Sequence, residues 1–568
     1  MTDIATLISR FFVNSGDVSI PGEMVPYTSE GNTVIPLVDG DNYFGALRQE
    51  VDILKPAGGT GKFFYFANWY LALTPSAGGP AAAGSGVTAW TGSEDPYPAF
   101  KLDDEQGGPY PDFIDELAEM AANGTDVRAF GWISPLDVRY QDVEARAGLF
   151  HINAATLLSI DALRQKPGMD KSACLDVLAH PMGAMHLKMV LCGDDSDARA
   201  FVSGLDFSVS RVDGPRHPNG ATFGWHDAGA KVEGQAVQGI YDYFRALWNE
   251  QRSRSTDAFR VGDKEIVTVV DGTPEIPART FTSPGPGGMH VQVLRTGPQM
   301  HFATGATDAV PVNCLYRFVA GFATNSWSFA TNGIFEFEPA LKKAIRSAQQ
   351  YIYVEDQGYW GQPIMDWLRD ALVANTDLKL IMVHHADPAD GPSVLRNTFA
   401  AINNHLGSGG VNMDGQVAFY ERTDRVVVHA KTWIIDDVYV VIGSANCFRR
   451  SLYTDGEISV GVIDEDATDN NVAIRYRRML WGEHCGLYTD PDTAVLTDLT
   501  QAIKIWDPSW DVGGVSAAGP PPAGLLTVFQ RKRVPFESGS NPDQFPSVDT
   551  SLTPTEYDQV DADSQKEY

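Results

Sequence analysis

A chain of 568 residues is longer than one simple hydrophobic core supports, so its length predicts several domains or one large duplicated unit. Lys and Arg total 43 against 73 Asp and Glu, and the resulting net charge of −30 opposes binding to nucleic-acid phosphates or tight adsorption to anionic membranes. Five widely spaced cysteines without a C-x-x-C pair argue against a disulfide framework and against a zinc site.

We expect no targeting or membrane-spanning segment in this sequence. Its N-terminal stretch, MTDIATLISRFFVNSGD, lacks a basic region followed by a long apolar run. No segment approaches the roughly 18 uninterrupted apolar residues that a transmembrane helix needs. We therefore expect a cytoplasmic protein, or one exported without a recognisable signal peptide.

Helical and strand-like segments alternate through the first half of the chain. Apolar residues at helical spacing predict helices, and runs of aromatic and β-branched residues predict strands. In chain order, we expect a helix over 43–54, a strand over 62–73, a helix over 111–124, a strand over 126–134, a helix over 152–165 and an extended segment over 173–181. The segment MHLKMVLCG then follows at 185–193.

The second half repeats this order. We expect a helix over 338–350, a strand over 351–357, a helix over 364–375, a strand over 378–386, a helix over 393–407 and a strand over 417–421. VVVHAKTWII then follows, so His-x-Lys occurs twice, at 186/188 and at 429/431, each after a similar series. This repetition predicts a duplicated α/β architecture with one His-x-Lys strand near the centre of each sheet.

The predicted units and connections have different compositions. We assign an N-terminal lobe to 1–325, a C-terminal lobe to 326–510 and a Pro-, Gly- and Asp-rich tail to 511–568. Within the first lobe, 74–110 is rich in Gly, Ala and Pro, and 254–292 contains TSPGPGGMH. We interpret both segments as insertions.

The second His-x-Lys segment can assemble a phosphate site. Residues i and i+2 of a strand share a face, so His429 and Lys431 are expected to point the same way. A hairpin through VYVVIG returns the chain and brings Ser444 and Asn446 to its end. Lys, Ser and Asn suit the oxygens of a phosphate, while His can attack the phosphorus or donate a proton.

The first copy offers a similar set, with His186 and Lys188 on one strand and Asp206 at the end of the returning RAFVSGLD. Two histidines suit a double displacement on a phosphodiester. One attacks and forms a phosphohistidine, and the other protonates the leaving alcohol and then activates water or a second alcohol.

The segment HAKTWIIDDVYVVIGSAN fits H-x-K-x4-D-x6-G-S-x-N and resembles the signature of the phospholipase D superfamily. The matching positions are His429, Lys431, Asp436, Gly443, Ser444 and Asn446. In the first copy, Gly193 stands at the Asp position, Asp194 comes one residue later, and the return strand is delayed by three residues. We interpret this difference as a longer hairpin turn, and the ending SGLD is similar to the G-G-L-D of eukaryotic-type phospholipases D.

Other segments resemble the same family in the same order, over about residues 38–490. They are the strand containing Trp69, the WHD segment at 225–227, YIYVEDQ at 351–357 and DGEISV at 455–460. The resemblance implies a duplicated phospholipase D-type α/β sandwich, in which two pseudo-twofold-related lobes share one active-site cleft. It implies no cofactor and no metal in the chemistry.

The resemblance also implies roles for individual residues. His186 would be the nucleophile and His429 the general acid, with Asp227 and Glu457 orienting the two imidazoles. Phosphate or substrate contacts are expected from Lys188, Lys431, Asn446, Ser444, Asp206, Trp225 and Gln357, and motif-stabilising roles from Asp194, Asp436 and Gly443.

Several alternatives stay open. Asp436 is also a natural hairpin-turn residue, and Asp227 and Glu457 could serve only as caps or ion-pair partners. His384-His385-x-Asp387 is spaced like a metal cluster, but adjacent strand residues face opposite ways, so we expect at most one of the two histidines to line a pocket.

The sequence favours a monomeric enzyme that makes transient contact with a membrane or micelle surface. It would convert a phospholipid to phosphatidic acid and a headgroup alcohol, or transfer the phosphatidyl group to another alcohol. One alternative is a different phosphodiester enzyme, either a nuclease or a small-molecule transferase. The other is a catalytically silent phosphate- or lipid-binding protein, if the three-residue insertion displaces His186.

Overall fold

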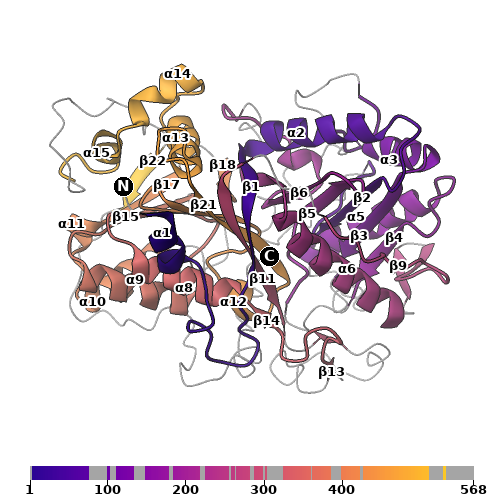
Figure 1. The fold of residues 1–568 in the computed structure, drawn as a ribbon, viewed down its shortest axis with the longest axis horizontal. Helices are drawn as coiled ribbons and strands as arrows, with labels where there is room; N and C mark the ends of the chain where they lie inside the picture. Colours follow the sequence, from indigo (N-terminus) through magenta and orange to yellow (C-terminus); the bar gives the residue numbers. More distant parts are fainter. Residues whose placement is uncertain are drawn as a thin grey trace.

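The computed structural model has two lobes side by side, with most of the first half of the chain on the right of Figure 1 and most of the second half on the left. It describes residues 3–75, 99–102, 110–133, 147–177, 183–217, 224–254, 258–261, 264–281, 287–298, 301–302, 324–359, 361–385, 398–422, 426–510 and 529–532. The insertion predicted over 74–110 lies largely outside these residues, as do Cys314 and Asp387.

The first half contains the predicted series of helices and strands with shifted ends. Its elements are α1 (Ile4–Phe11), β1 (Tyr27–Val38), α2 (Asp39–Leu54), β2 (Phe63–Asn68), α3 (Phe113–Ala122), β3 (Asp126–Trp132), α5 (Ala147–Arg164), β4 (Ala173–Asp176), β5 (Met189–Gly193), β6 (Ala198–Ser203), β7 (Gly224–His226), β8 (Ala228–Glu233), α6 (Ala236–Arg254), β9 (Ala258–Val261) and β10 (Lys264–Val267).

The second half repeats the series. Its elements are β11 (Met289–Gly297), β12 (His301–Phe302), β13 (Thr324–Asn325), β14 (Ile334–Phe335), α8 (Phe337–Ser347), β15 (Tyr351–Glu355), α9 (Gln362–Ala374), β16 (Lys379–His385), α10 (Thr398–Ser408), α11 (Met413–Gln416), β17 (Val417–Arg422), β18 (Val426–Val428), β19 (Thr432–Ile435), β20 (Tyr439–Gly443), α12 (Arg449–Tyr453), β21 (Glu457–Asp464), α13 (Val472–His484), α14 (Asp490–Thr493), α15 (Leu499–Ala502) and β22 (Phe529–Lys532).

One sheet runs through both lobes, and its strand order, apart from β22 at one edge, is the same when read inwards from either side. The first half contributes β4-β3-β2-β5-β6-β8, and the second contributes β17-β16-β15-β19-β20-β21. In each series the first three strands are parallel and the others antiparallel. Strands β1 and β11 pair antiparallel where the halves meet. This palindromic order confirms the predicted duplicated α/β fold with pseudo-twofold-related halves.

Helices cover both faces of the sheet, because the buried strands are apolar on both sides. In β2, Phe63 and Tyr65 pack toward α6, whereas Phe64 and Phe66 pack toward α2, α3 and α5. In β15, alternate residues likewise divide between a cluster that includes α13 and one that includes α8, α9 and α10. The α6 and α13 sides belong to one continuous hydrophobic cluster, which joins the two halves.

Three features of the fold differ from the sequence expectation. The predicted insertion at 254–292 runs into β11, a central strand that stands where β1 stands in the other half. The predicted tail at 511–568 supplies β22, which pairs with β17 at the sheet edge. β1 itself was not predicted, since its sequence TSEGNTVIPLV lacks strict alternation. The lobe boundary at residue 325 stays a prediction.

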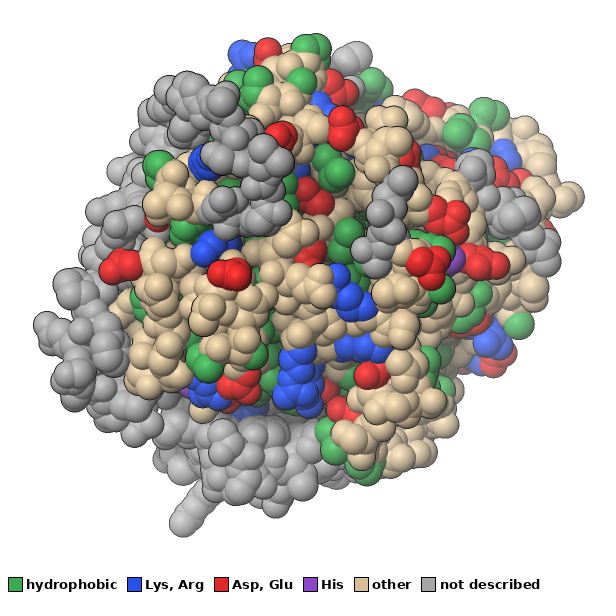
Figure 2. Space-filling model, turned by 60° about the vertical axis from the view of Figure 1, so that its left-hand side comes forward, with side chains coloured by type: hydrophobic (Ala, Val, Ile, Leu, Met, Phe, Trp, Pro, Cys, Tyr) green, Lys and Arg blue, Asp and Glu red, His purple; other side chains and the backbone are tan. Residues whose placement is uncertain are grey.

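The surface mixes charges of both signs. On the face in Figure 2, acidic side chains are scattered and the largest group of Lys and Arg side chains lies near the middle. None of the described helices is long and apolar enough to cross a membrane.

Candidate active site

Both His-x-Lys segments lie in breaks between strands rather than inside one continuous strand. The second lies between β18 and β19, and the first lies between an isolated bridge at Met185 and the start of β5. β18 leaves the main sheet and pairs with β7 of the other half, and Met185 bridges Gly456. The expectation of an unbroken strand is therefore wrong, because each segment crosses from one half to the other at this point.

This crossing places each histidine against a carboxylate from the opposite half. His186 Nδ1 lies 2.9 Å from Glu457 Oε1, and both side chains are buried. Ser451 Oγ donates to Glu457 Oε1 at 2.6 Å, and Ser444 Oγ donates to Oε2 at 2.5 Å. The predicted Ser444 therefore holds the carboxylate that faces His186.

The second pair is built in the same way from different residues. His429 Nδ1 lies 2.6 Å from Asp227 Oδ2, which also accepts from the indole Nε1 of Trp225 at 3.0 Å. The amide of Ala228 donates to the other oxygen, Oδ1, at 2.8 Å. The Trp225 ring centroid lies 4.9 Å from that of His429, so Trp225 contacts both members of the pair.

The two lysines are fully buried beside their own histidines. Lys188 Nζ donates to the carbonyl of His186 at 3.0 Å, and Lys431 Nζ donates to that of His429 at 2.6 Å. Burial lowers the pKa of Lys188 and lowers that of Lys431 to about 8. A buried ammonium group with few hydrogen-bond partners attracts an anion strongly.

Burial controls the protonation of the histidine–carboxylate pairs. Burial and the nearby lysines lower the pKa of His186 and of His429 well below its usual value, and Arg211 contributes at His429. Burial raises the pKa of Asp227 to about 6 and that of Glu457 to about 7. A neutral imidazole that donates its Nδ1 proton to the carboxylate presents Nε2 as a base or nucleophile.

Asn446 and Asp206 occupy matching positions after the returning strands. Ser444 N donates to Ile458 O, and Gly204 N donates to Ala228 O, each at 2.9 Å, which aligns the two returns residue by residue. Asn446 is buried, and neither atom of its side-chain amide has a hydrogen-bond partner among the described residues. Asp206 Oδ1 accepts from the amide of Tyr70 at 3.0 Å. The other carboxylate oxygen, Oδ2, lies 4.0 Å from Lys188 Nζ.

The remaining predicted substrate residue, Gln357, is half-buried after β15. Ala67 pairs with Met189, three residues after His186, and Glu355 pairs with Thr432, three residues after His429. Trp69 and Gln357 each lie two residues further along their segments, so Gln357 is the counterpart of Trp69. The Trp69 ring lies 5.3 Å from Lys188 Nζ and 5.9 Å from His186. The first copy therefore has an indole where the second has an amide.

The motif residues lie at the hairpins. Asp436 Oδ1 accepts from the backbone amides of Gln350 and Tyr351 at 2.7 and 3.0 Å, at the far end of β19 from His429. Asp194 Oδ1 accepts from the amides of Ser196 and Asp197 within its own turn, at 2.8 and 3.0 Å.

Gly443 is packed too tightly for a side chain, since an added Cβ would lie 2.4 Å from the carbonyl oxygen of Ile458. The two predicted histidines of the other motif, His384 and His385, stack at 4.3 Å at the end of β16. His384 Nε2 lies 2.6 Å from the carbonyl oxygen of Gln357, so it holds the loop that carries this residue.

Sequence reasoning missed Arg211 and Ser451. The Arg211 guanidinium lies 3.3 Å from the centre of the Trp225 ring, and it helps to lower the pKa of His429. Neither residue lies in the His-x-Lys segments. Only the pairing between halves reveals that Ser451 and Arg211 reach the same site.

Comparisons with known proteins agree with this geometry. A family model described as "Cardiolipin synthase, PLD-like domain" matches residues 341–478. Phospholipase D beta 1 of Arabidopsis thaliana is 22% identical over 413 residues, which cover 54% of this chain and 37% of that protein. Phospholipase D alpha 4 of the same plant is 26% identical over 321 residues, which cover 48% of this chain and 40% of that protein. The matches thus span less than half the length of these relatives.

Two solved structures are also similar. A phosphatidylserine synthase of Haemophilus influenzae has a TM-score of 0.47 and 11% identity, covering 82% of this chain and 92% of that chain. Nuc, a phospholipase D family member of Salmonella typhimurium, has a TM-score of 0.19 and 21% identity, covering 23% of this chain and 77% of that chain. The family model and the phospholipase D relatives, together with two His-x-Lys segments on a duplicated sheet, support a phospholipase D superfamily member.

Proposed function

We propose that this protein cleaves a glycerophospholipid at the phosphodiester bond to its headgroup, and passes the phosphatidyl group to water or to an alcohol. One observation carries the proposal. Two buried histidines, each hydrogen-bonded to a carboxylate of the opposite half, flank two buried lysines. That set provides a nucleophile, a general acid and a phosphate site within one small volume.

In the proposed first step, His186 Nε2 attacks the phosphorus and the bond to the headgroup oxygen breaks. His429 gives its Nε2 proton to that oxygen, and Asp227 stabilises the imidazolium before the transfer. Lys188, Lys431 and the unpartnered amide of Asn446 hold the phosphate oxygens. The negative phosphate favours the protonated form of His429 on binding, and so prepares the acid.

In the second step, His429 Nε2 accepts a proton from water or an alcohol, whose oxygen attacks the phosphohistidine. The P–N bond breaks and His186 returns to its neutral form, releasing phosphatidic acid or a new phosphodiester. Each imidazole therefore performs one role at a time, and the carboxylates keep both rings oriented through both steps.

The names of the relatives favour a lipid over a nucleic acid, and the net charge of −30 points the same way. The cardiolipin synthase type of family model keeps transfer to an alcohol open as a second candidate. We further propose that the protein acts as a monomer that contacts a membrane or micelle surface transiently.

The test uses mixed micelles of phosphatidylcholine with and without ethanol. Released choline reports cleavage, while phosphatidylethanol and phosphatidic acid separate transfer from hydrolysis. We expect release by the wild type and its loss in His186→Ala and His429→Ala. His290→Ala is the matched control, because His290 pairs with Glu465 at 2.7 Å on β11, outside the site.

Choline release that survives both substitutions would contradict the proposal, as would activity on DNA or bis(p-nitrophenyl) phosphate alone. No release from phosphatidylcholine, phosphatidylethanolamine or phosphatidylglycerol, with phosphate still binding beside His186 and His429, would favour the silent binding protein.

A further inference from the structure

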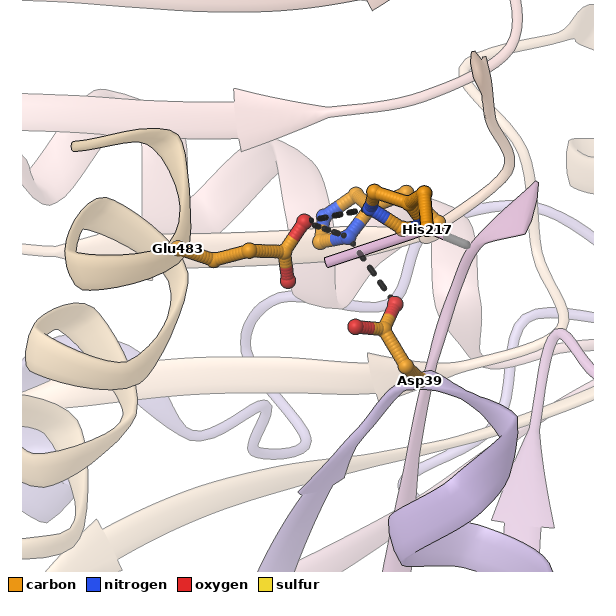
Figure 3. A group of neighbouring side chains, drawn as sticks. Asp39, His217 and Glu483 are labelled. Atoms are coloured by element: carbon orange, nitrogen blue, oxygen red, sulfur yellow. Dashed lines mark hydrogen bonds and ion pairs between the residues drawn. The ribbon is translucent and has the colours of Figure 1, made fainter. Parts of the chain in front are cut away.

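A second cluster of histidines and carboxylates lies at the junction of the two halves. It consists of Asp39 at the start of α2, His217 in the loop before β7, His226 in β7, and Glu483 in α13. All four side chains are buried. Figure 3 shows the carboxyl group of Glu483 turned toward the imidazole of His217, while Asp39 approaches the same group of side chains from α2.

The four side chains converge on one point. Glu483 Oε1 lies 2.8 Å from His217 Nε2 and 2.9 Å from His226 Nδ1. Asp39 Oδ1 lies 3.0 Å from His226 Nδ1. One nitrogen or oxygen atom from each of the four residues lies within 4.8 Å of all the others. Two imidazoles with two carboxylates form a donor set that suits zinc and similar divalent ions.

The outer nitrogens of both imidazoles have carboxylate partners. His217 Nδ1 lies 3.0 Å from Asp213 Oδ2, and His226 Nε2 lies 2.7 Å from Glu355 Oε2. Asp213 Oδ2 also accepts from the amide of Trp225 at 2.7 Å, so this outer carboxylate is held in place. Metal-binding histidines typically donate their second N–H to a carboxylate in this way, which aims the other nitrogen at the ion.

A separate observation points to a missing partner. Asp39 Oδ2 and Glu483 Oε2 are buried, and neither has a hydrogen-bond partner among the described residues. A buried carboxylate oxygen without a partner is destabilising, because nothing replaces the water that it loses on folding. Two of them in one cluster indicate that a cation belongs there.

We propose that Asp39, His217, His226 and Glu483 bind one divalent transition-metal ion of the zinc class. Four protein ligands would leave no open position, so the site is structural and takes no part in the chemistry proposed above. It would fasten α13 of the second half to α2 and β7 of the first. The carbonyl of His226 accepts from the amide of His429 at 2.7 Å, so the ion would also steady the active site.

An ion-pair network that includes Arg422 is the alternative to a bound metal ion. Its Nη1 lies 3.1 Å from Glu483 Oε1 and 3.3 Å from His217 Nε2. Without an ion, this guanidinium and protonated histidines would balance the carboxylates as an ion-pair network. A guanidinium repels a metal cation, so removing Arg422 should strengthen metal binding. The substitution therefore distinguishes a metal site from an ion-pair network.

The experiment measures metal content of the untagged full-length protein by plasma mass spectrometry, then titrates the chelator-treated protein with Zn²⁺ alone. We expect about one ion per chain, a higher melting temperature with Zn²⁺, and loss of both in His217→Asn and Glu483→Gln. His290→Gln is the matched control, because it removes a His–carboxylate pair elsewhere and should keep the ion. Arg422→Met should bind Zn²⁺ at least about tenfold more tightly.

Wild-type protein that contains no transition metal and gains no stability from Zn²⁺ would overturn the proposal, even if the variants fail to fold. Zn²⁺ binding that persists in both ligand variants would place the ion elsewhere and overturn it as well. None of these readouts depends on phospholipid cleavage, so this proposal and the proposed function can fail separately.

Discussion

In the first half of the chain, His186 faces Glu457, whose oxygens accept from two serine hydroxyls. In the second half, His429 faces Asp227, which accepts from an indole and a backbone amide and has Arg211 stacked behind its tryptophan partner. The backbone arrangement is the same around both histidines. Each carboxylate comes from the opposite half, and the two returning strands align residue by residue.

The duplication places the two imidazoles alike, whereas the side chains around them differ. Arg211 adds positive charge at His429, and such a charge favours release of a proton. Trp69 places an aromatic face at His186, where the second copy has Gln357. The halves are therefore suited to different roles, and the following variants test how different those roles are.

The largest effect should come from replacing the histidines, and the substrate should reveal their roles. On phosphatidylcholine, both His186→Asn and His429→Asn should lose at least about 10³-fold in kcat/KM. On a phosphatidyl p-nitrophenol ester, whose leaving group needs no proton, His429→Asn should still release one burst of p-nitrophenol. His186→Asn should release none. Stopped-flow absorbance measures the burst.

A burst from His186→Asn in place of His429→Asn would reverse the assignment of nucleophile and acid. A burst from neither, with both proteins folded by circular dichroism, would mean that both imidazoles are needed before the P–O bond breaks. His290→Asn, outside the site, should behave as the wild type does.

The carboxylates should give the next largest effect. Asp227→Asn and Glu457→Gln keep the shape but leave Nδ1 facing an amide, so the imidazole loses both its orientation and its stabilised cation. We expect a loss of about 10²–10³-fold in kcat with little change in KM. Asp227→Asn should be partly spared on the p-nitrophenol ester, because it supports the acid. Equal losses on both substrates would contradict the division of roles.

The lysines should differ in how they respond to pH. Burial, and the charge of Lys188, lower the pKa of Lys431 to about 8, and a lysine without its proton cannot neutralise phosphate. kcat/KM should therefore fall as the pH rises through about 8. Lys431→Arg should be slower but should lose this alkaline limb, because a guanidinium stays charged. Lys188→Arg should keep the limb, because this substitution leaves Lys431 and its titration in place.

Much of the architecture could be predicted from the sequence because each repeat carries strong local signals. Amphipathic helices such as α3 and apolar strands such as β16 are recognisable from spacing alone. The His-x-Lys segments were recognisable because their polar residues interrupt an apolar run.

The rest depends on contacts between distant residues. β1 and β11 form the centre of the sheet and pair with each other across the two repeats, but their sequences mix polar and apolar residues. The cluster of Asp39, His217, His226 and Glu483 comes from four separate segments of the chain, so no spacing rule could reveal it. The placement of Ser451 against Glu457 and the break before β19 follow from the same cross-pairing.

The smallest effect on activity should come from the two hairpins, which differ in length. β5 and β6 form five ladder pairs around a four-residue turn, whereas β19 and β20 form four pairs around three residues. The three extra residues of the first copy are thus one more pair and one more turn residue, all at the end away from His186. The longer hairpin therefore does not displace His186.

The turn carboxylates should therefore matter for stability rather than for catalysis, and to unequal degrees. Asp436 is buried and binds the backbone amides of residues 349–351 as well as Arg10, so Asp436→Ala should cost about 3 kcal/mol of unfolding free energy. Among the described residues, the side chain of Asp194 accepts hydrogen bonds from Ser196 and Asp197 of its own turn, so Asp194→Ala should cost about 0.5–1 kcal/mol. Urea unfolding measures both, and kcat should stay within about twofold of the wild type. A folded Asp436→Ala protein that has lost activity would instead give this carboxylate a part in the reaction.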